Sequence, residues 1–156
     1  MTIRPAIKTD LPAMVALIET YRRRLQTWRP VFWKKAGGSA ELSMLWFGHL
    51  MNQGNVLTLI SEQDGKANGF LIASLIDAPP VYDIPGKACM IDDYAVETDA
   101  LWASVGRDLL SEAKAWARQK DAAQVIVVSP TDHADKNGFM ENEGLAETTK
   151  WWTGTP

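Results

Sequence analysis

Two adjacent carboxylates, Asp92 and Asp93, lie inside a segment that otherwise favours a β-strand, residues 88–96. Two adjacent acids are unusual in a strand that belongs wholly to a core, and a carboxylate can act as a general base. Because side chains alternate between the two faces of a strand, residues 90, 92, 94 and 96 are predicted to share one face. That arrangement places Asp92 beside Tyr94. A strand end that carries two solvated acids is the alternative.

A second chemically suggestive stretch, residues 101–107, follows that strand at the start of a predicted helix. Its small residues allow the backbone to approach an anion closely; they are Ala103, Ser104 and Gly106. A helix N-terminus offers N–H donors and a favourable dipole potential, and Arg107 adds positive charge. The stretch therefore predicts a phosphate site. Alternatively, Ser104 merely faces solvent and Gly106 only eases helix–sheet packing.

Composition excludes several other kinds of site in these 156 residues. Cys89 is the only cysteine and the chain has 2 histidines, which argues against a disulfide framework and against a zinc site. The formal net charge is -3, so no global basic field is available to bind nucleic acid. No apolar run is long enough to cross a membrane, and no signal-peptide pattern is visible. We expect a cytoplasmic protein with no metal site, no nucleic-acid partner and no membrane contact.

The elements that must position these residues follow from apolar periodicity and turn signals. The predicted order is β-α-α-β-β-β-α-β-α-β, which indicates a single α/β domain over residues 1–156 with a mixed sheet. The expected strands cover residues 3–7, 56–60, 69–76, 88–96 and 124–129, with a last strand through Trp151 and Trp152. The first expected helix starts within residues 9–12 and ends at residues 28–30, and the second carries an apolar stripe over residues 42–49 after a joint at residues 37–39. The other expected helices cover residues 101–119 and about 132–143. Residues 77–87 are predicted to be a loop that acts as a lid or a partner contact.

The segment from Tyr94 to Leu110 resembles the acetyl-CoA signature of the GCN5-related N-acetyltransferase (GNAT) superfamily. That signature is Leu-x-Val at a strand end, a spacer, and then Arg/Gln-x-x-Gly-x-Gly/Ala. The resemblance implies a GNAT fold with helices on both faces of the sheet, and acetyl-CoA as co-substrate. The cofactor-binding residues it implies are Tyr94, Ala95, Val96, Leu101, Trp102, Ala103, Ser104, Val105, Gly106, Arg107 and His133.

Three residues depart from the family pattern. Leu101 replaces the usual Arg or Gln, and Ser104 replaces the first glycine of the loop. Met140 stands where many members carry a general-acid tyrosine. Leucine supplies no side-chain donor to a phosphate, and methionine supplies no proton to a thiolate.

The resemblance implies direct attack of an amine on acetyl-CoA in a ternary complex, so Cys89 is not needed as a nucleophile. We expect Asp92 to be the base, acting directly or through a water molecule. Asp93 is the alternative, because family members often carry a β-bulge here that would reverse the faces. Tyr94 is the candidate proton donor to the thiolate, with a core aromatic role as the alternative. A backbone N–H near Val96 would polarise the thioester carbonyl.

The sequence therefore predicts an acetyl-CoA-dependent N-acetyltransferase that acts on a small amine or a peptide amine. The alternative is a non-catalytic acyl-CoA-binding or protein-interaction module with a degenerate GNAT fold. Aromatic residues around the first two helices predict either an acceptor pocket or ordinary core; they are Trp28, Phe32, Trp33, Trp46 and Phe47. A basic stretch over residues 22–35 indicates a solvated helix face, an anionic ligand or an acidic partner. The predicted last strand suits a homodimer contact.

Overall fold

The computed structural model describes residues 1–78, 81–82, 84 and 86–154. The strands are β1 (Thr2–Pro5), β2 (Val56–Gln63), β3 (Lys66–Asp77), β4 (Lys87–Val96) and β5 (Ala122–Val127). The helices are α1 (Leu11–Trp28), α2 (Ser39–Leu50), α3 (Arg107–Gln119) and α4 (Ala134–Asn142). Short helical turns precede α1 and α3; they are η1 (Lys8–Asp10), η2 (Asp99–Leu101) and η3 (Trp102–Gly106), the last with π-helical geometry.

The strands form one five-stranded sheet in the order β1-β2-β3-β4-β5. Neighbouring strands are antiparallel except β4 and β5, which are parallel and joined through α3. A tight turn at Asp64 and Gly65, both with positive φ, connects β2 to β3. The predicted mixed α/β sheet is confirmed.

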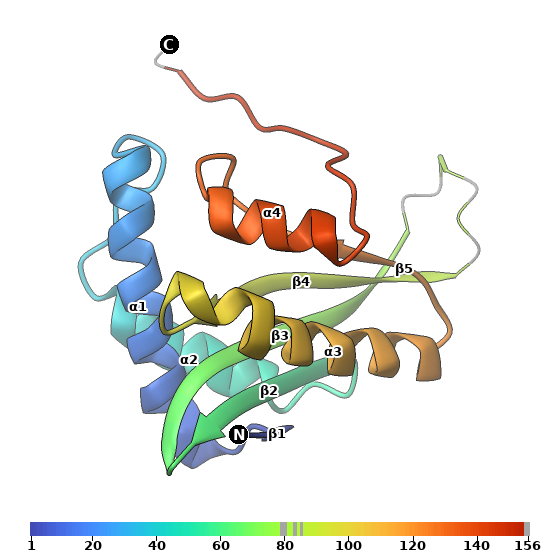
Figure 1. Ribbon diagram of the computed structural model, residues 1–156, viewed down its shortest axis with the longest axis horizontal. Coiled ribbons are helices and arrows are strands. Elements are labelled where there is room, and N and C mark those ends of the chain that lie inside the picture. Colours follow the sequence, from blue (N-terminus) through green and yellow to red (C-terminus); the bar gives the residue numbers. More distant parts are fainter. Residues whose placement is uncertain (79–80, 83, 85, 155–156) are drawn as a thin grey trace.

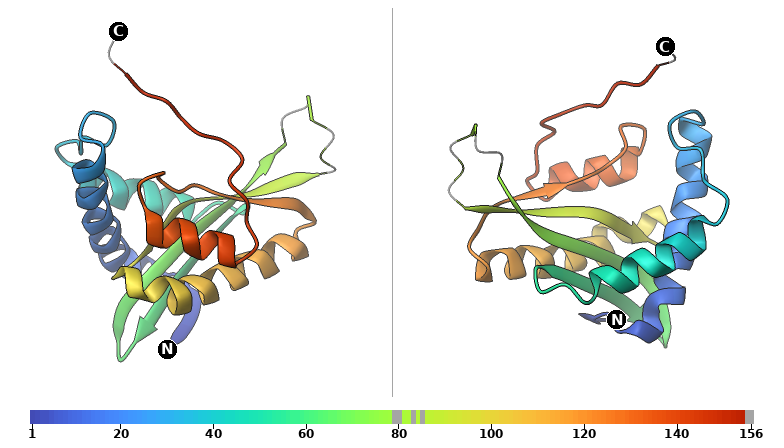
Figure 2. Two further views of the ribbon diagram at one scale, coloured as in Figure 1. Left: turned by 45° about the horizontal axis from the view of Figure 1, so that its top comes forward. Right: turned by 180° about the vertical axis from the view of Figure 1, so that it is seen from behind.

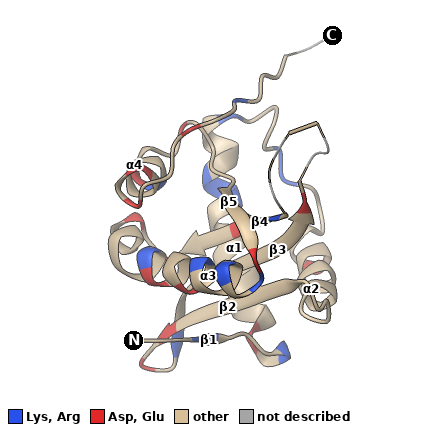
Figure 3. Cartoon of the chain, turned by 90° about the vertical axis from the view of Figure 1, so that its right-hand side faces the viewer, with Lys and Arg blue, Asp and Glu red and all other residues tan. Residues whose placement is uncertain are grey.

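Helices cover both faces of the sheet, as Figures 1 and 2 show. Helices α1 and α2 pack on one face around a cluster that includes Met14, Phe47 and Phe70. Helices α3 and α4 lie over the other face, where Trp102 and Leu109 belong to the second cluster. Figure 3 shows charged residues mostly on the helices and at the ends of the strands, while the strands between them are largely uncharged. The two apolar clusters hold the sheet between its helical layers.

The predicted last strand is wrong. Residues 145–154 form no strand, and their chain leads away from the sheet (Figure 1). Trp151 and Trp152 are 83% and 91% exposed. Strand propensity reflects packing against neighbouring strands more than an intrinsic backbone preference. Without a partner strand among the described residues, the two tryptophans stay in solvent.

β3 ends and β4 begins at the end of the sheet away from α1 (Figure 1). Of the residues predicted to form a lid, 79, 80, 83 and 85 lie outside the described residues. Of the helices in the described parts of the chain, none has the length and apolar character needed to cross a bilayer.

Candidate active site

A β-bulge interrupts β4 at the two predicted acids. In the pairing with β3, Leu71 is opposite Tyr94 and Ala73 is opposite Ile91. Two residues of β4, Asp92 and Asp93, therefore face a single residue of β3. Ile91 and Tyr94 both belong to the cluster on the α3 side. The uninterrupted alternation predicted for residues 90–96 is wrong, because the bulge absorbs one residue.

The bulge gives the two carboxylates different surroundings. Asp92 is exposed, whereas the side chain of Asp93 is only 19% exposed. Burial, and secondarily the charge of Asp92, raises the pKa of Asp93 to about 6, against the opposing effects of Arg22 and Lys136. Asp93 is therefore the carboxylate whose pKa lies closer to neutral pH.

Both acids border a cavity of ≈ 460 Å³ between α1, the segment that follows it, the start of α2 and the end of β5. Tyr21, Phe32, Trp33 and Trp46 supply aromatic walls. The basic side chains around it are Arg22, Lys34, Lys35 and Lys136. Three of the five aromatic residues predicted for an acceptor pocket thus lie here. The other two do not: Phe47 packs in the core against Phe70, and Trp28 packs against His133.

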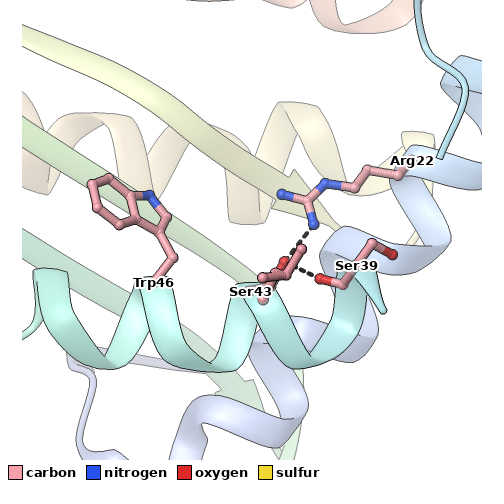
Figure 4. Close-up of a pocket in the computed structure, with 5 residues that line it drawn as sticks. Arg22, Ser39, Ser43 and Trp46 are labelled. Carbon is pink, nitrogen blue, oxygen red and sulfur yellow. Dashed lines mark hydrogen bonds between the residues drawn. The ribbon is translucent and has the colours of Figure 1, made fainter. Parts of the chain in front are cut away.

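A smaller hollow of ≈ 290 Å³ adjoins this cavity and shares Arg22, Ser39 and Trp46 with it. Figure 4 shows Arg22 reaching from α1 over α2, where it donates a hydrogen bond to the Ser43 hydroxyl. The Ser43 hydroxyl in turn donates to the Ser39 carbonyl over 2.8 Å. Arg22 also donates to Glu19, so its position is fixed from both helices.

Lys136 also borders the cavity, although the sequence did not lead us to predict it there. Its ammonium donates to the carbonyls of Val128, at 3.1 Å, and Tyr94, at 3.3 Å, so it bridges the strands where β4 and β5 separate. Burial lowers the pKa of Lys136 to about 7, although Asp92 and Asp93 act in the opposite direction. The available signal was its spacing from Phe139 and Met140, which places a lysine on the apolar face of α4.

Of the comparisons with known proteins, only the one with solved structures finds similar proteins. No protein-family model and no curated protein matches the sequence. A mutant of the BH1408 protein from Bacillus halodurans matches with a TM-score of 0.86 at 14% identity, over 100% of this chain and 99% of that one. Aminoglycoside 6'-N-acetyltransferase AAC(6')-Ig from Acinetobacter haemolyticus matches with a TM-score of 0.75 at 18% identity, over 100% and 98%. An acetyltransferase from Clostridium acetobutylicum, described as predicted and solved with acetyl-CoA, matches at 0.74 and 15%, over 99% and 95%. The chain has the GNAT fold.

Within this GNAT fold, the predicted phosphate segment begins a helix as expected but is partly enclosed by the core. Trp102 is 2% exposed and packs against Tyr94 and Phe139. The Leu101 amide donates to the Thr98 carbonyl, and the Trp102 amide donates to the Asp99 carbonyl. Gly106 has the Trp102 ring and the Tyr94 hydroxyl directly beside it, so its lack of a side chain serves packing.

Tyr94 and His133 are both engaged away from the cavity. The buried Tyr94 hydroxyl donates to the Gly106 carbonyl, and burial raises its pKa. His133 contacts the Tyr21 hydroxyl through Nδ1 and the Asp99 carboxylate through Nε2, each at 3.0 Å. Arg24 completes this chain with a bidentate contact to Asp99. This GNAT fold therefore brings Asp92 and Asp93 to a cavity, while neither of the two cavities is bordered by a residue predicted only for cofactor binding.

Proposed function

We propose that the protein is an acetyl-CoA-dependent N-acetyltransferase that transfers an acetyl group to a small amine or a peptide amine. The observation that carries the proposal is Asp93, a half-buried carboxylate with a raised pKa, at the bulge of a GNAT sheet and beside an open cavity. Structural neighbours solved with acetyl-CoA or CoA support acetyl-CoA as the co-substrate. Neighbours described as aminoglycoside N-acetyltransferases support an amine as the acceptor.

Asp93 is the proposed base. An amine acceptor is mostly protonated at pH 7, and only its neutral form attacks the thioester. A carboxylate with a pKa of about 6 is mostly ionised at that pH and is therefore available to accept the proton. Asp92 borders the same cavity, but its side chain is exposed. It is therefore held less firmly than Asp93 and is less suited to fix the position of a substrate amine.

The leaving thiolate needs a proton as the C–S bond breaks, and Lys136 is the proposed donor. Lys136 borders the cavity, and an acid with a pKa of about 7 transfers a proton readily to a thiolate. Tyr94 is less suited, because it borders neither cavity and burial raises the pKa of its hydroxyl, whereas burial lowers the pKa of Lys136. Transfer of the amine proton from Asp93 back to Lys136 through water restores both groups. A backbone N–H near Val96 would polarise the carbonyl.

A second candidate function is a non-catalytic module that retains the fold. The observation that favours it is that other side chains already engage predicted cofactor residues and occupy the neighbouring space. Trp102 packs on Phe139, His133 has a partner at each ring nitrogen, and the Lys136 ammonium occupies the separation between β4 and β5. An acyl-CoA arm entering there has to displace that ammonium.

Calorimetric titration with acetyl-CoA, followed by an amine-panel assay for released thiol, tests both candidates. Binding and turnover support the enzyme, and binding without turnover supports an acyl-CoA-binding module. The absence of binding contradicts the enzyme and leaves a protein-interaction module. In an active protein, Asp93→Asn should lower kcat/KM about a hundredfold at pH 7. The loss should shrink at high pH, where neutral amine accumulates unaided. Asp92→Asn is the matched control; if it causes the larger loss, the assignment of the base to Asp93 is wrong.

A further inference from the structure

The wall of the larger cavity contains a donor and an acceptor that face each other without bonding. Arg22 Nη2 and Asp93 Oδ1 are 3.9 Å apart, which is too long for a hydrogen bond. The other terminal nitrogen of Arg22 is engaged by Ser43 and Glu19. Among the described residues, neither Nη2 of Arg22 nor the carboxylate of Asp93 has a hydrogen-bond partner, so both remain available to a ligand.

We infer that the acceptor is a free α-amino acid with an apolar or aromatic side chain, bound with its carboxylate on Arg22 and its amine on Asp93. This inference rests on the proposed function. An α-amino acid carries its amine and carboxylate on one carbon, so the two groups can engage partners that are themselves close neighbours. Arg is suited to the carboxylate, because its planar fork gives charge-assisted hydrogen bonds.

The position of Arg22 is fixed before any ligand binds. Glu19 is 7% exposed and accepts hydrogen bonds from Arg22, Lys35 and Ser39, while Ser43 holds the guanidinium from α2. A guanidinium held in this way loses little side-chain entropy when a carboxylate binds. Lys34 lies exposed on the same wall and adds positive charge where the carboxylate would enter.

The rest of the cavity suits the side chain of such an acceptor. Ile18, Leu25, Phe32, Trp33 and Trp46 border it, and ligand sites combine apolar walls of this kind with a few fixed polar groups. A polycationic acceptor fits less well. Several ammonium groups would have to approach Arg22, Lys34 and Lys35, and like charges repel. The cavity therefore favours a zwitterion over an aminoglycoside.

Matched acceptors test the inference on the unmodified protein. We would measure kcat/KM for L-tryptophan and L-phenylalanine, for their decarboxylated counterparts tryptamine and phenethylamine, for L-tryptophan methyl ester, and for kanamycin. A charge-assisted hydrogen bond to the substrate carboxylate should favour each amino acid over its amine by about tenfold to a hundredfold. The methyl ester should behave like tryptamine, and kanamycin should be the poorest acceptor.

Three variants test whether Arg22 causes the preference. Arg22→Gln should reduce the tryptophan-to-tryptamine ratio to about one, while the exposed neighbour Arg23→Gln should leave it unchanged. Because Arg22 also supports the packing of α1 on α2, Lys34→Gln provides a surface variant that should lower the ratio without affecting folding.

The outcomes separate this inference from the proposed function. Acetylation of amines and amino acids with equal kcat/KM, or a preference for kanamycin, overturns the amino-acid assignment and leaves the enzyme in place. An amino-acid preference that survives Arg22→Gln overturns the role of Arg22. If acetyl-CoA neither binds nor is consumed with any acceptor, the proposed function fails and this inference fails with it.

Discussion

Replacing Asp93 with asparagine should make the protein more stable as well as less active. The carboxylate has a pKa of about 6 in the folded protein, raised from 3.8 chiefly by burial. A raised carboxyl pKa means that the folded state disfavours the ionised form relative to the unfolded chain. Asparagine has nearly the same shape and carries no charge to desolvate.

The magnitude follows from the shift. About two pKa units correspond to about 3 kcal/mol of unfolding free energy, which the parent loses as the pH rises from about 4 to about 6. Below that range the carboxyl group is protonated in both states and its effect vanishes; above it the loss is complete. This shift already includes the opposing effects of Arg22 and Lys136, so we expect a net gain of up to about 3 kcal/mol at pH 8.

Urea unfolding of the parent and of Asp93→Asn, measured between pH 4 and pH 8, tests this reasoning. The difference in unfolding free energy should be small at pH 4, grow up to about pH 6 and remain constant above it. Asp92→Asn, at the exposed position of the same bulge, should change stability by less than Asp93→Asn does, because it removes only the secondary effect of its charge on the pKa of Asp93. A difference that does not depend on pH, or a variant less stable than the parent at pH 8, would refute the assigned burial of Asp93.

Two further predictions concern the core beside the site. Gly106→Ala should destabilise the protein by about 1–3 kcal/mol, because the new Cβ would lie 2.9 Å from the Trp102 ring. Gly54→Ala, where a Cβ meets open space, is the control, and equal denaturation midpoints would contradict the packing argument. Lys136→Met should abolish a gain in stability that the parent shows as the pH rises from about 7 towards 10.5, because over that range the unfolded chain holds a proton that the folded lysine has lost. Parallel pH profiles of unfolding free energy for parent and variant would show that Lys136 does not titrate in this way.

Much of the fold could be predicted because local patterns and tertiary packing agree. The Asp64–Gly65 turn, the apolar run of β3 and the periodicity of α1 each favour the element that forms. Trp151 and Trp152 show the limit of such patterns. Their strand propensity needs a neighbouring strand, and whether one is present depends on the path of the whole chain.

Only part of the candidate site could be predicted, because its geometry also depends on the path of the whole chain. The unusual pair of acids marked the segment that borders the cavity, but which acid is the more buried depends on the β3–β4 register, which no local pattern reveals. Lys136 was missed because a lysine on a helix is ordinarily solvated. Its burial depends on rings from three other segments, those of Tyr21, Tyr94 and Trp102. His133 was assigned by family position, whereas its contacts are set by where α1 and η2 meet α4.

The bulge in β4 also bears on how such a site can arise or be lost. On either side of it, Ile91 and Tyr94 face the same core cluster, so the extra residue changes the orientation of neither. A regular strand could gain one residue here without moving any core side chain to the opposite face. Conversely, deletion of either acid would restore ordinary pairing while leaving both apolar layers intact. The remaining acid would then lie opposite Ile72, on the face that α1 and α2 cover. Chains with this sheet can therefore differ by a single inserted codon in whether they present one carboxylate or two to the cavity.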